Sequence, residues 1–143
     1  MLTGQLALMA ATVFAGAAFY VSVAEHPARM LLDDRAALAQ WKPAYTRGAA
    51  MQATLAIVGF LLGLAAWWQT GRMIWLIGAG FLIANWPYTL IGIMPTNHKL
   101  EATAPDDAGP QTRVLLEKWG TLHAGRTVLG IVAAILFLWA TLN

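Results

Sequence analysis

The sequence of 143 residues contains no cysteine and few charged residues, and these two absences exclude several classes of protein. Without cysteine there is no disulfide framework and no cysteine-ligated zinc site. Charged residues make up 11% of the chain, whereas they make up about a quarter of a typical globular domain. The formal net charge of +2 does not supply the basic surface of a nucleic-acid-binding protein, so no nucleic-acid partner is expected.

Motifs for nucleotide binding and for nucleophilic catalysis are also missing. There is no phosphate loop, no dinucleotide fingerprint and no serine or cysteine nucleophile motif. The three histidines, His26, His98 and His123, are not spaced by one helical turn, and no Glu-x-x-His pair occurs. We therefore expect neither a metal ion nor another cofactor.

The chain does have long uncharged runs, and 59% of its residues are hydrophobic. These runs cover residues 1–24, 48–71, 73–97 and 127–143. A helix needs about 20 apolar residues to cross a hydrocarbon core about 30 Å thick, and the last run reaches this length if it begins near Trp119. The sequence predicts an all-α protein, a single four-transmembrane-helix bundle of residues 1–143 with spans at about 2–24, 48–69, 72–95 and 117–142.

The segment between the first two spans carries a helical pattern of its own. Pro27 suits the first turn of a helix, and apolar residues follow at helical spacings: Leu31, Leu38, Trp41 and Tyr45. Pro43 would then end this helix before the second span. We therefore predict a short interfacial helix between the first and second spans.

The distribution of charge predicts an orientation in the membrane. An even number of spans places both termini and the turn at Arg72 on one face, with all other Lys and Arg residues on the opposite face. The positive-inside rule assigns the basic face to the cytoplasm. We expect an integral protein of the bacterial inner membrane with both termini outside the cytoplasm. The first span lacks the basic region that precedes a cleaved signal peptide.

Several polar residues fall at span ends on the basic face: Glu25, Arg29, Arg47, Asn97, His123 and Arg126. Ionisable groups so close to hydrocarbon cost free energy unless they are paired or wetted. In one interpretation the arginines are interfacial anchors and Glu25 pairs with one of them. In the other, these residues form a catalytic pocket in which His123 accepts a proton, Arg126 stabilises an anion and Glu25 orients one of them.

The third span contains the unusual segment Asn85-Trp86-Pro87-Tyr88-Thr89. Pro87 removes a backbone hydrogen bond in a helix that crosses the membrane, which a packing kink would explain. Alternatively, Trp86, Tyr88 and Tyr20 form aromatic walls for a lipophilic planar ligand. In the second span, the Gly59-x3-Gly63 motif packs this helix within the bundle or in a homo-oligomer.

Four motifs in order along the chain resemble the DUF1772, or anthrone oxygenase-like, family. They are Glu25-His-Pro-Ala-Arg29, Trp41-x3-Tyr45-x-Arg47-Gly48, Pro95-Thr-Asn97-x2-Leu100 and Trp119-x3-His123-x2-Arg126-Thr127. The resemblance covers the whole chain and implies a four-helix membrane protein. It also implies oxygenase chemistry, because a few fungal relatives are implicated in oxidising anthrones to anthraquinones without an evident metal or flavin.

The resulting hypothesis is a membrane-embedded oxidoreductase, a cofactor-independent oxygenase of lipophilic aromatic compounds such as anthrones or quinols. Its catalytic candidates are His123, Arg126 and Glu25. The substrate-binding candidates are Arg29, Trp41, Tyr45, Arg47, Trp86, Tyr88, Asn97, Trp119 and Tyr20. The alternative is a non-enzymatic lipid- or quinone-binding or helper protein, and a small transporter is the least favoured. The expected partners are a lipophilic small molecule and membrane lipid.

The orientation can be tested with fusions to the C-terminus. Alkaline phosphatase fused after Asn143 is expected to be active and a fluorescent protein fused at the same position dark, because the positive-inside rule places this end outside the cytoplasm. The measurement is phosphatase activity and fluorescence of whole cells. A bright, phosphatase-negative result would contradict the orientation without affecting the number of spans.

Overall fold

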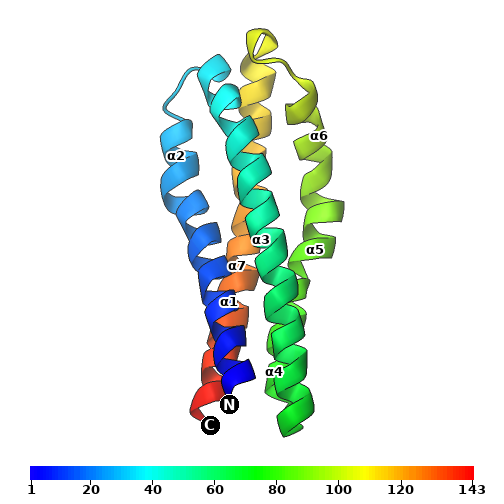
Figure 1. Cartoon of the computed structure of the whole chain (residues 1–143). Coiled ribbons are helices and arrows are strands. Elements are labelled where there is room, and N and C mark those ends of the chain that lie inside the picture. The colour runs from blue at the N-terminus through cyan, green and yellow to red at the C-terminus, as the bar shows by residue number, and fades with distance from the viewer.

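The computed structural model describes all residues, 1–143, as four long antiparallel helical rods (Figure 1). The first rod comprises α1 (Leu2–Tyr20), the π-helix η1 (Val21–Glu25) and α2 (His26–Arg29), and the second is α3 (Asp34–Thr70). The third comprises α4 (Met73–Ile83), α5 (Asn85–Tyr88), the π-helix η2 (Thr89–Ile93) and α6 (Met94–Ala102). A 3₁₀ turn, η3 (Pro105–Asp107), leads to the fourth rod, α7 (Pro110–Leu142). All four rods are long and apolar enough to cross a membrane, which confirms the predicted all-α, four-span fold.

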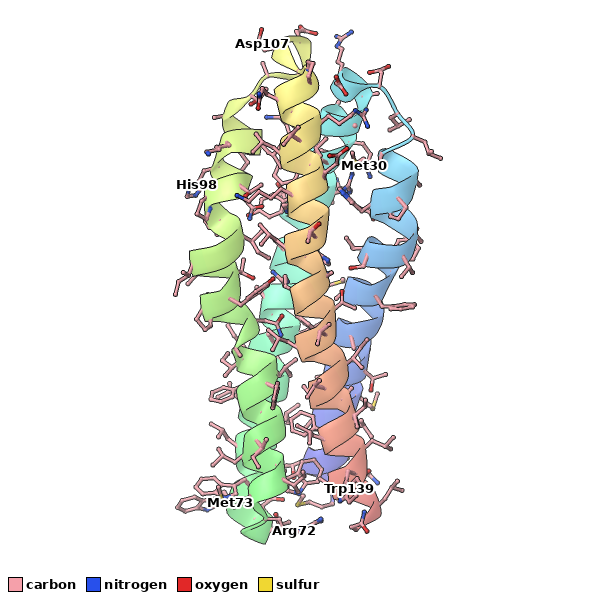
Figure 2. All side chains as sticks on the ribbon, turned by 180° about the vertical axis from the view of Figure 1, so that it is seen from behind. Met30, Arg72, Met73, His98, Asp107 and Trp139 are labelled. Carbon is pink, nitrogen blue, oxygen red and sulfur yellow. The ribbon has the colours of Figure 1, made fainter.

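The rods form a square in cross-section. α1 packs against α3 and α7, and α4 packs against the same two helices, so α1 and α4 lie on a diagonal. Both termini lie at the end of the bundle where α3 turns into α4 (Figure 1). Figure 2 shows Arg72, Met73 and Trp139 at this end, and Met30 and Asp107 toward the other. The two charged connections therefore share one end, as the even number of spans predicts.

The half of the bundle near the termini is packed through small residues. Its core combines alanines with a few large side chains: Ala7, Ala11, Phe14, Ala18, Ala56, Ala66, Trp75, Ala79, Leu82, Ala133, Phe137 and Ala140. Gly63 lies against Phe137, and Gly59 lies against Leu82 of α4 and Ala10 of α1. The Gly59-x3-Gly63 motif therefore packs α3 within its own bundle, because both glycines face neighbouring helices of the same chain.

The separate interfacial helix predicted between the first two spans is absent, and this expectation was wrong. His26–Arg29 continue the first rod, only Met30–Asp33 connect the rods, and α3 runs unbroken from Asp34 through Pro43. Proline is tolerated here because it and Ala39, whose carbonyl loses its partner, lie on an exposed face of the helix. Asp33 caps the new N-terminus by accepting a hydrogen bond from the Ala36 N–H at 2.9 Å.

Two π-helical turns widen the rods in the half of the bundle far from the termini. η1 ends at Glu25, shortly before Pro27, and η2 ends at Ile93, shortly before Pro95. A proline ring collides with the carbonyl four residues earlier, and a local switch to wider hydrogen bonding relieves this collision. A π-turn shortly before a proline thus interrupts both the first and the third rod at the same level of the bundle.

The packing of the half near the termini is testable at Gly63. A Cβ atom there would lie 2.8 Å from Phe137 Cζ and 2.9 Å from Ala79 Cβ, so Gly63→Ala is expected to destabilise the protein by about 1–3 kcal/mol. Gly16→Ala is the matched control, because a Cβ at Gly16 meets nothing within 4 Å. The measurement is the thermal unfolding midpoint in detergent, and equal midpoints for the two variants would contradict the packing.

Candidate functional site

In the half of the bundle far from the termini, the rods line a partly open polar cavity of about 30 Å³, enough for one or two water-sized molecules. The residues that line it come from every rod and include Glu25, Arg29, Tyr45, Gln52, Thr89, Asn97, Trp119, His123 and Arg126. Arg126 lies about 24 Å along α7 from Leu142 at 1.5 Å per residue. A hydrocarbon layer about 30 Å thick that begins near Leu142 would therefore include the level of Arg126.

The guanidinium of Arg126 is the central charge of the cavity, and the residue is only 8% exposed. Its NH1 donates to Thr89 Oγ1 at 2.9 Å and its NH2 donates to Gln52 Oε1 at 3.0 Å. The group lies 5.7 Å from the ring centre of Phe14. No carboxylate forms an ion pair with Arg126, and its buried Nε has no hydrogen-bond partner. A buried cation with only neutral partners favours an anion in the adjoining cavity.

His123 lies one helical turn before Arg126 on the same helix and is also buried. Its Nδ1 is 3.3 Å from Ser22 Oγ, and Ser22 is in turn 2.9 Å from Thr127 Oγ1. The imidazole stacks on Trp119, with ring centres 5.0 Å apart. If Ser22 donates to Thr127, it can accept from the imidazole N–H at Nδ1, and Nε2 then has a free lone pair.

Glu25 forms an ion pair with Arg29, in which NH2 of Arg29 donates to Oε1 of Glu25 at 2.6 Å. This agrees with the interpretation in which Glu25 pairs with one of the arginines. The buried guanidinium of Arg29 also donates to Gln40 Oε1 and, at 2.9 Å, to His26 Nδ1. Its Cζ lies 5.5 Å from the ring centre of Trp119. Glu25 makes no hydrogen bond to His123, whose partner is Ser22 instead. The carboxylate therefore neutralises Arg29 and leaves Arg126 uncompensated.

An aromatic cluster covers the cavity on the side of the charged connections. Trp41 stacks on Tyr45 with ring centres 4.7 Å apart, and it lies perpendicular to Trp119 with ring centres 6.0 Å apart. The surrounding core adds Ala37, Leu38, Ile93, Leu100 and Leu116. The Asn97 amide donates to Tyr45 Oη at 3.0 Å and fixes that ring at the edge of the cavity. This cluster separates the polar cavity from the exposed loops.

A second cavity of about 170 Å³ adjoins the first between α3 and the third rod. Tyr45, Ala49, Thr89 and Arg126 line both cavities. The other walls of this lateral cavity are Ala53, Ala56, Asn85, Trp86, Leu90 and Met94. An apolar cavity of about 150 Å³ can hold benzene, so an aromatic ring fits here. Because Trp86 and Leu90 are partly exposed on the outer face of the bundle, the lateral cavity faces the lipid side.

Four of the predicted binding residues line neither cavity, and the first of them, Trp41, packs in the aromatic cluster. Arg47 is exposed and lines neither cavity, which favours its interpretation as an interfacial anchor. Tyr20 is 59% exposed on the outside of the first rod. Tyr88 turns toward α7, where its hydroxyl donates to the Leu122 carbonyl at 2.6 Å. Of the three predicted aromatic walls, only Trp86 lines the lateral cavity.

Sequence reasoning gave no site role to Ser22, His26, Gln52 or Thr89, although Thr89 belongs to the unusual segment of the third span. Ser22 and Thr89 lie on the two π-turns, so the prolines that follow these turns could have indicated them. Gln52 lies within an apolar run, where a polar side chain calls for a partner, and its partner is Arg126. His26 gives no such signal, because only the fold brings it against Trp119, at 5.2 Å between ring centres.

The fold does not bring together a set of side chains that could bind a metal ion. No three side chains of His, Cys, Asp or Glu come close enough together to hold a metal ion. His26 and His123 each contact the Trp119 ring, with ring centres 5.2 and 5.0 Å from it, and His98 is exposed.

The fold and the site together define a class: an all-helical protein with four helices able to cross a membrane and a buried arginine without a counter-ion that lines a cavity between them. The family model described as anthrone oxygenase matches residues 41–136. The chain is also 31% identical to an anthrone oxygenase of Claviceps purpurea (strain 20.1) over 92% of its own length and 83% of that protein. The chain belongs to the anthrone oxygenase family. No solved structure matches it.

The ion pair of Glu25 with Arg29 provides a stability test. Glu25→Gln leaves a buried guanidinium without its counter-ion, and breaking a fully buried pair costs about 3–5 kcal/mol. Because the Glu25 side chain is 28% exposed, we expect a smaller loss of about 1–3 kcal/mol. Asp106→Asn is the control, since its pair with Arg35 is exposed to solvent and contributes little. Equal unfolding midpoints in detergent for the two variants would contradict a structural role of the Glu25 pair.

Proposed function

We propose that this protein is a cofactor-independent oxygenase that converts a lipophilic anthrone- or quinol-like compound with O₂. The observation that carries this proposal is the buried Arg126 guanidinium, which has no carboxylate partner and lines both cavities. Such a cation stabilises an oxyanion that develops on a bound ligand, and it does so more strongly in a site that excludes water. Membership of the anthrone oxygenase family supports this reaction class.

The aromatic part of the substrate would occupy the lateral cavity, with its carbonyl oxygen at Arg126 and its CH₂ group toward His123. Trp86 and the alanines of α3 provide apolar walls for the rings. A ligand dissolved in the bilayer would enter between α3 and η2 without crossing the aromatic cluster. The protein would act as an integral protein of the inner membrane, with its site near the cytoplasmic face, because the basic residues gather at that end.

His123 would act as the general base. A neutral imidazole with its proton on Nδ1, donated to Ser22, accepts the CH₂ proton of an anthrone at Nε2. The carbonyl then becomes an enolate whose negative charge lies beside Arg126. The reaction converts a neutral pair into an imidazolium and an enolate, and the guanidinium offsets the second charge.

The remaining steps balance without a reductant. The enolate carbon forms a bond to O₂, and the resulting peroxide takes the proton held by His123. Loss of the second C–H proton then breaks the O–O bond, so that one oxygen stays as the new carbonyl and the other leaves as water. Anthrone and O₂ thus give anthraquinone and water. The four electrons that reduce O₂ come from the two C–H bonds of the substrate.

The activity test follows O₂ uptake and anthraquinone formation when anthrone is added to the protein in lipid nanodiscs. His123→Gln is expected to slow turnover by about 10²–10⁴-fold, the usual contribution of a general base. Arg126→Gln is expected to slow it by about 10²–10³-fold, as for removal of one oxyanion donor. Empty nanodiscs provide the rate of spontaneous oxidation.

Lys118→Gln is the matched control, because Lys118 is an exposed cation on the same helix as Arg126 and lines neither cavity. Its rate is expected to equal that of the unmodified protein. A rate unaffected by His123→Gln would contradict the role of the base. Tight binding of anthrone without any O₂ uptake would instead support the alternative of a non-enzymatic lipid- or quinone-binding protein.

A further inference from the structure

The side-chain amide of Gln52 has a free hydrogen-bond donor beside the polar cavity, and the proposed reaction does not use it. Gln52 is 3% exposed, and its Oε1 accepts from Arg126 NH2 at 3.0 Å. Because a guanidinium can only donate, the amide oxygen has to face Arg126 and the Nε2 group has to point elsewhere. Nε2 donates to no protein atom and, unlike the buried Nε of Arg126, is not fully shielded. Gln52 lines the polar cavity and not the lateral one, so these N–H groups open into the polar cavity.

The polar cavity is too small for an aromatic ring but large enough for a diatomic molecule. Its volume of about 30 Å³ holds one or two water-sized molecules, whereas a cavity that binds benzene measures about 150 Å³. The lateral cavity, of about 170 Å³, is the one that fits a ring. Tyr45, Ala49, Thr89 and Arg126 line both cavities, so a molecule in one cavity lies beside a molecule in the other.

The groups around the polar cavity favour a small molecule that acquires negative charge. Arg126 has no carboxylate partner, and the one carboxylate in the cavity wall, that of Glu25, is paired with Arg29. The hydrogen bond from Arg126 polarises the amide of Gln52, which makes its N–H groups stronger donors. His123 lines the same cavity, and its Nε2 has no protein partner and is not fully shielded either. A cation, an amide donor and an imidazole therefore surround one small space.

We propose that the polar cavity is the O₂ site and that Gln52 is a further catalytic residue, whose Nε2 donates a hydrogen bond to the oxygen as it is reduced. This inference rests on the proposed function, which does not place O₂. With the aromatic rings in the lateral cavity, O₂ in the polar cavity lies beside the CH₂ carbon that His123 deprotonates. The two cavities thus hold the two substrates, and the residues that line both cavities lie where the substrates meet.

The role of Gln52 follows from the movement of charge in this step. Electron transfer from the enolate to O₂ gives superoxide and a neutral ligand radical, and their recombination forms the C–O bond of a peroxide anion. The negative charge thus passes from the enolate to the outer oxygen, which lies in the polar cavity. Gln52 and Arg126 stabilise this charge until the His123 imidazolium gives its proton to the peroxide, which leaves a hydroperoxide and a neutral imidazole.

The test separates the O₂ step from the formation of the enolate. Under anaerobic conditions, exchange of the anthrone CH₂ protons for deuterium reports enolate formation alone, whereas kcat/KM for O₂ reports the step that follows. In Gln52→Leu, kcat/KM for O₂ is expected to fall about 10²–10³-fold, as for removal of one oxyanion donor, while deuterium exchange stays within about three-fold. Gln69→Leu is the matched control, because Gln69 is an exposed glutamine of α3 that lines neither cavity, and both rates are expected to stay unchanged.

A second measurement uses azide, a small linear anion that resembles superoxide in charge and shape. Azide is expected to inhibit O₂ uptake by the unmodified protein competitively against O₂ and not against anthrone, because it occupies the polar cavity and leaves the lateral cavity open. Its inhibition constant is expected to rise about ten-fold in Gln52→Leu, which loses one hydrogen bond to the anion. Since the competition pattern needs no variant, this measurement holds even where Gln52→Leu folds poorly.

The outcomes separate this inference from the proposed function. Azide that competes with anthrone, or that does not inhibit, overturns the placement of O₂ in the polar cavity while anthrone turnover stands. An unchanged kcat/KM for O₂ in Gln52→Leu, or an equal loss in deuterium exchange, overturns the catalytic role of Gln52, because a purely structural change affects both steps. Absence of deuterium exchange and of O₂ uptake in the unmodified protein overturns the proposed function and this inference with it. A loss confined to the O₂ step, with azide competing against O₂, supports the assignment.

Discussion

The guanidinium of Arg126 is the interaction on which the site depends. It is held among three rods by neutral groups alone, with Thr89 on the third rod, Gln52 on the second and the Phe14 ring on the first. Neutral partners satisfy two of its nitrogens but leave the positive charge itself uncompensated. In a medium with little water, that charge raises the affinity of the adjoining cavity for an oxyanion.

The two buried arginines, Arg29 and Arg126, differ in whether a carboxylate lies beside them. Arg29 has the Glu25 carboxylate together with His26 and Gln40, so its charge and its hydrogen bonds are satisfied within the protein. It lies against one aromatic ring, Trp119, that also stacks on His123. Arg29 therefore supports the wall of the cavity, whereas Arg126 has no counter-ion within the protein.

The bundle divides into a closely packed half and a half that contains the cavities. Near the termini, glycine and alanine allow the rods to approach closely around Phe14, Trp75 and Phe137. Farther along, the two π-turns widen the first and third rods, and they present Ser22 and Thr89 to the residues of α7. The closely packed half near the termini fixes the four rods relative to one another. The other half can therefore hold its polar side chains in fixed positions and still leave the cavities open.

The sequence by itself determined the number of rods, their alternating direction and the end at which the polar residues gather, because long uncharged runs and charged connections follow directly from the cost of charge in hydrocarbon. It also indicated His123 and Arg126, which are one helical turn apart. The prediction that a separate helix ends at Pro43 was wrong, because Pro43 is tolerated on an exposed face of α3. Only the tertiary structure decided that Glu25 pairs with Arg29, that Ser22 meets His123, and that Arg47 and Tyr20 face outward. These outcomes depend on the rotation of each rod about its axis, which packing between helices sets and a single sequence does not reveal.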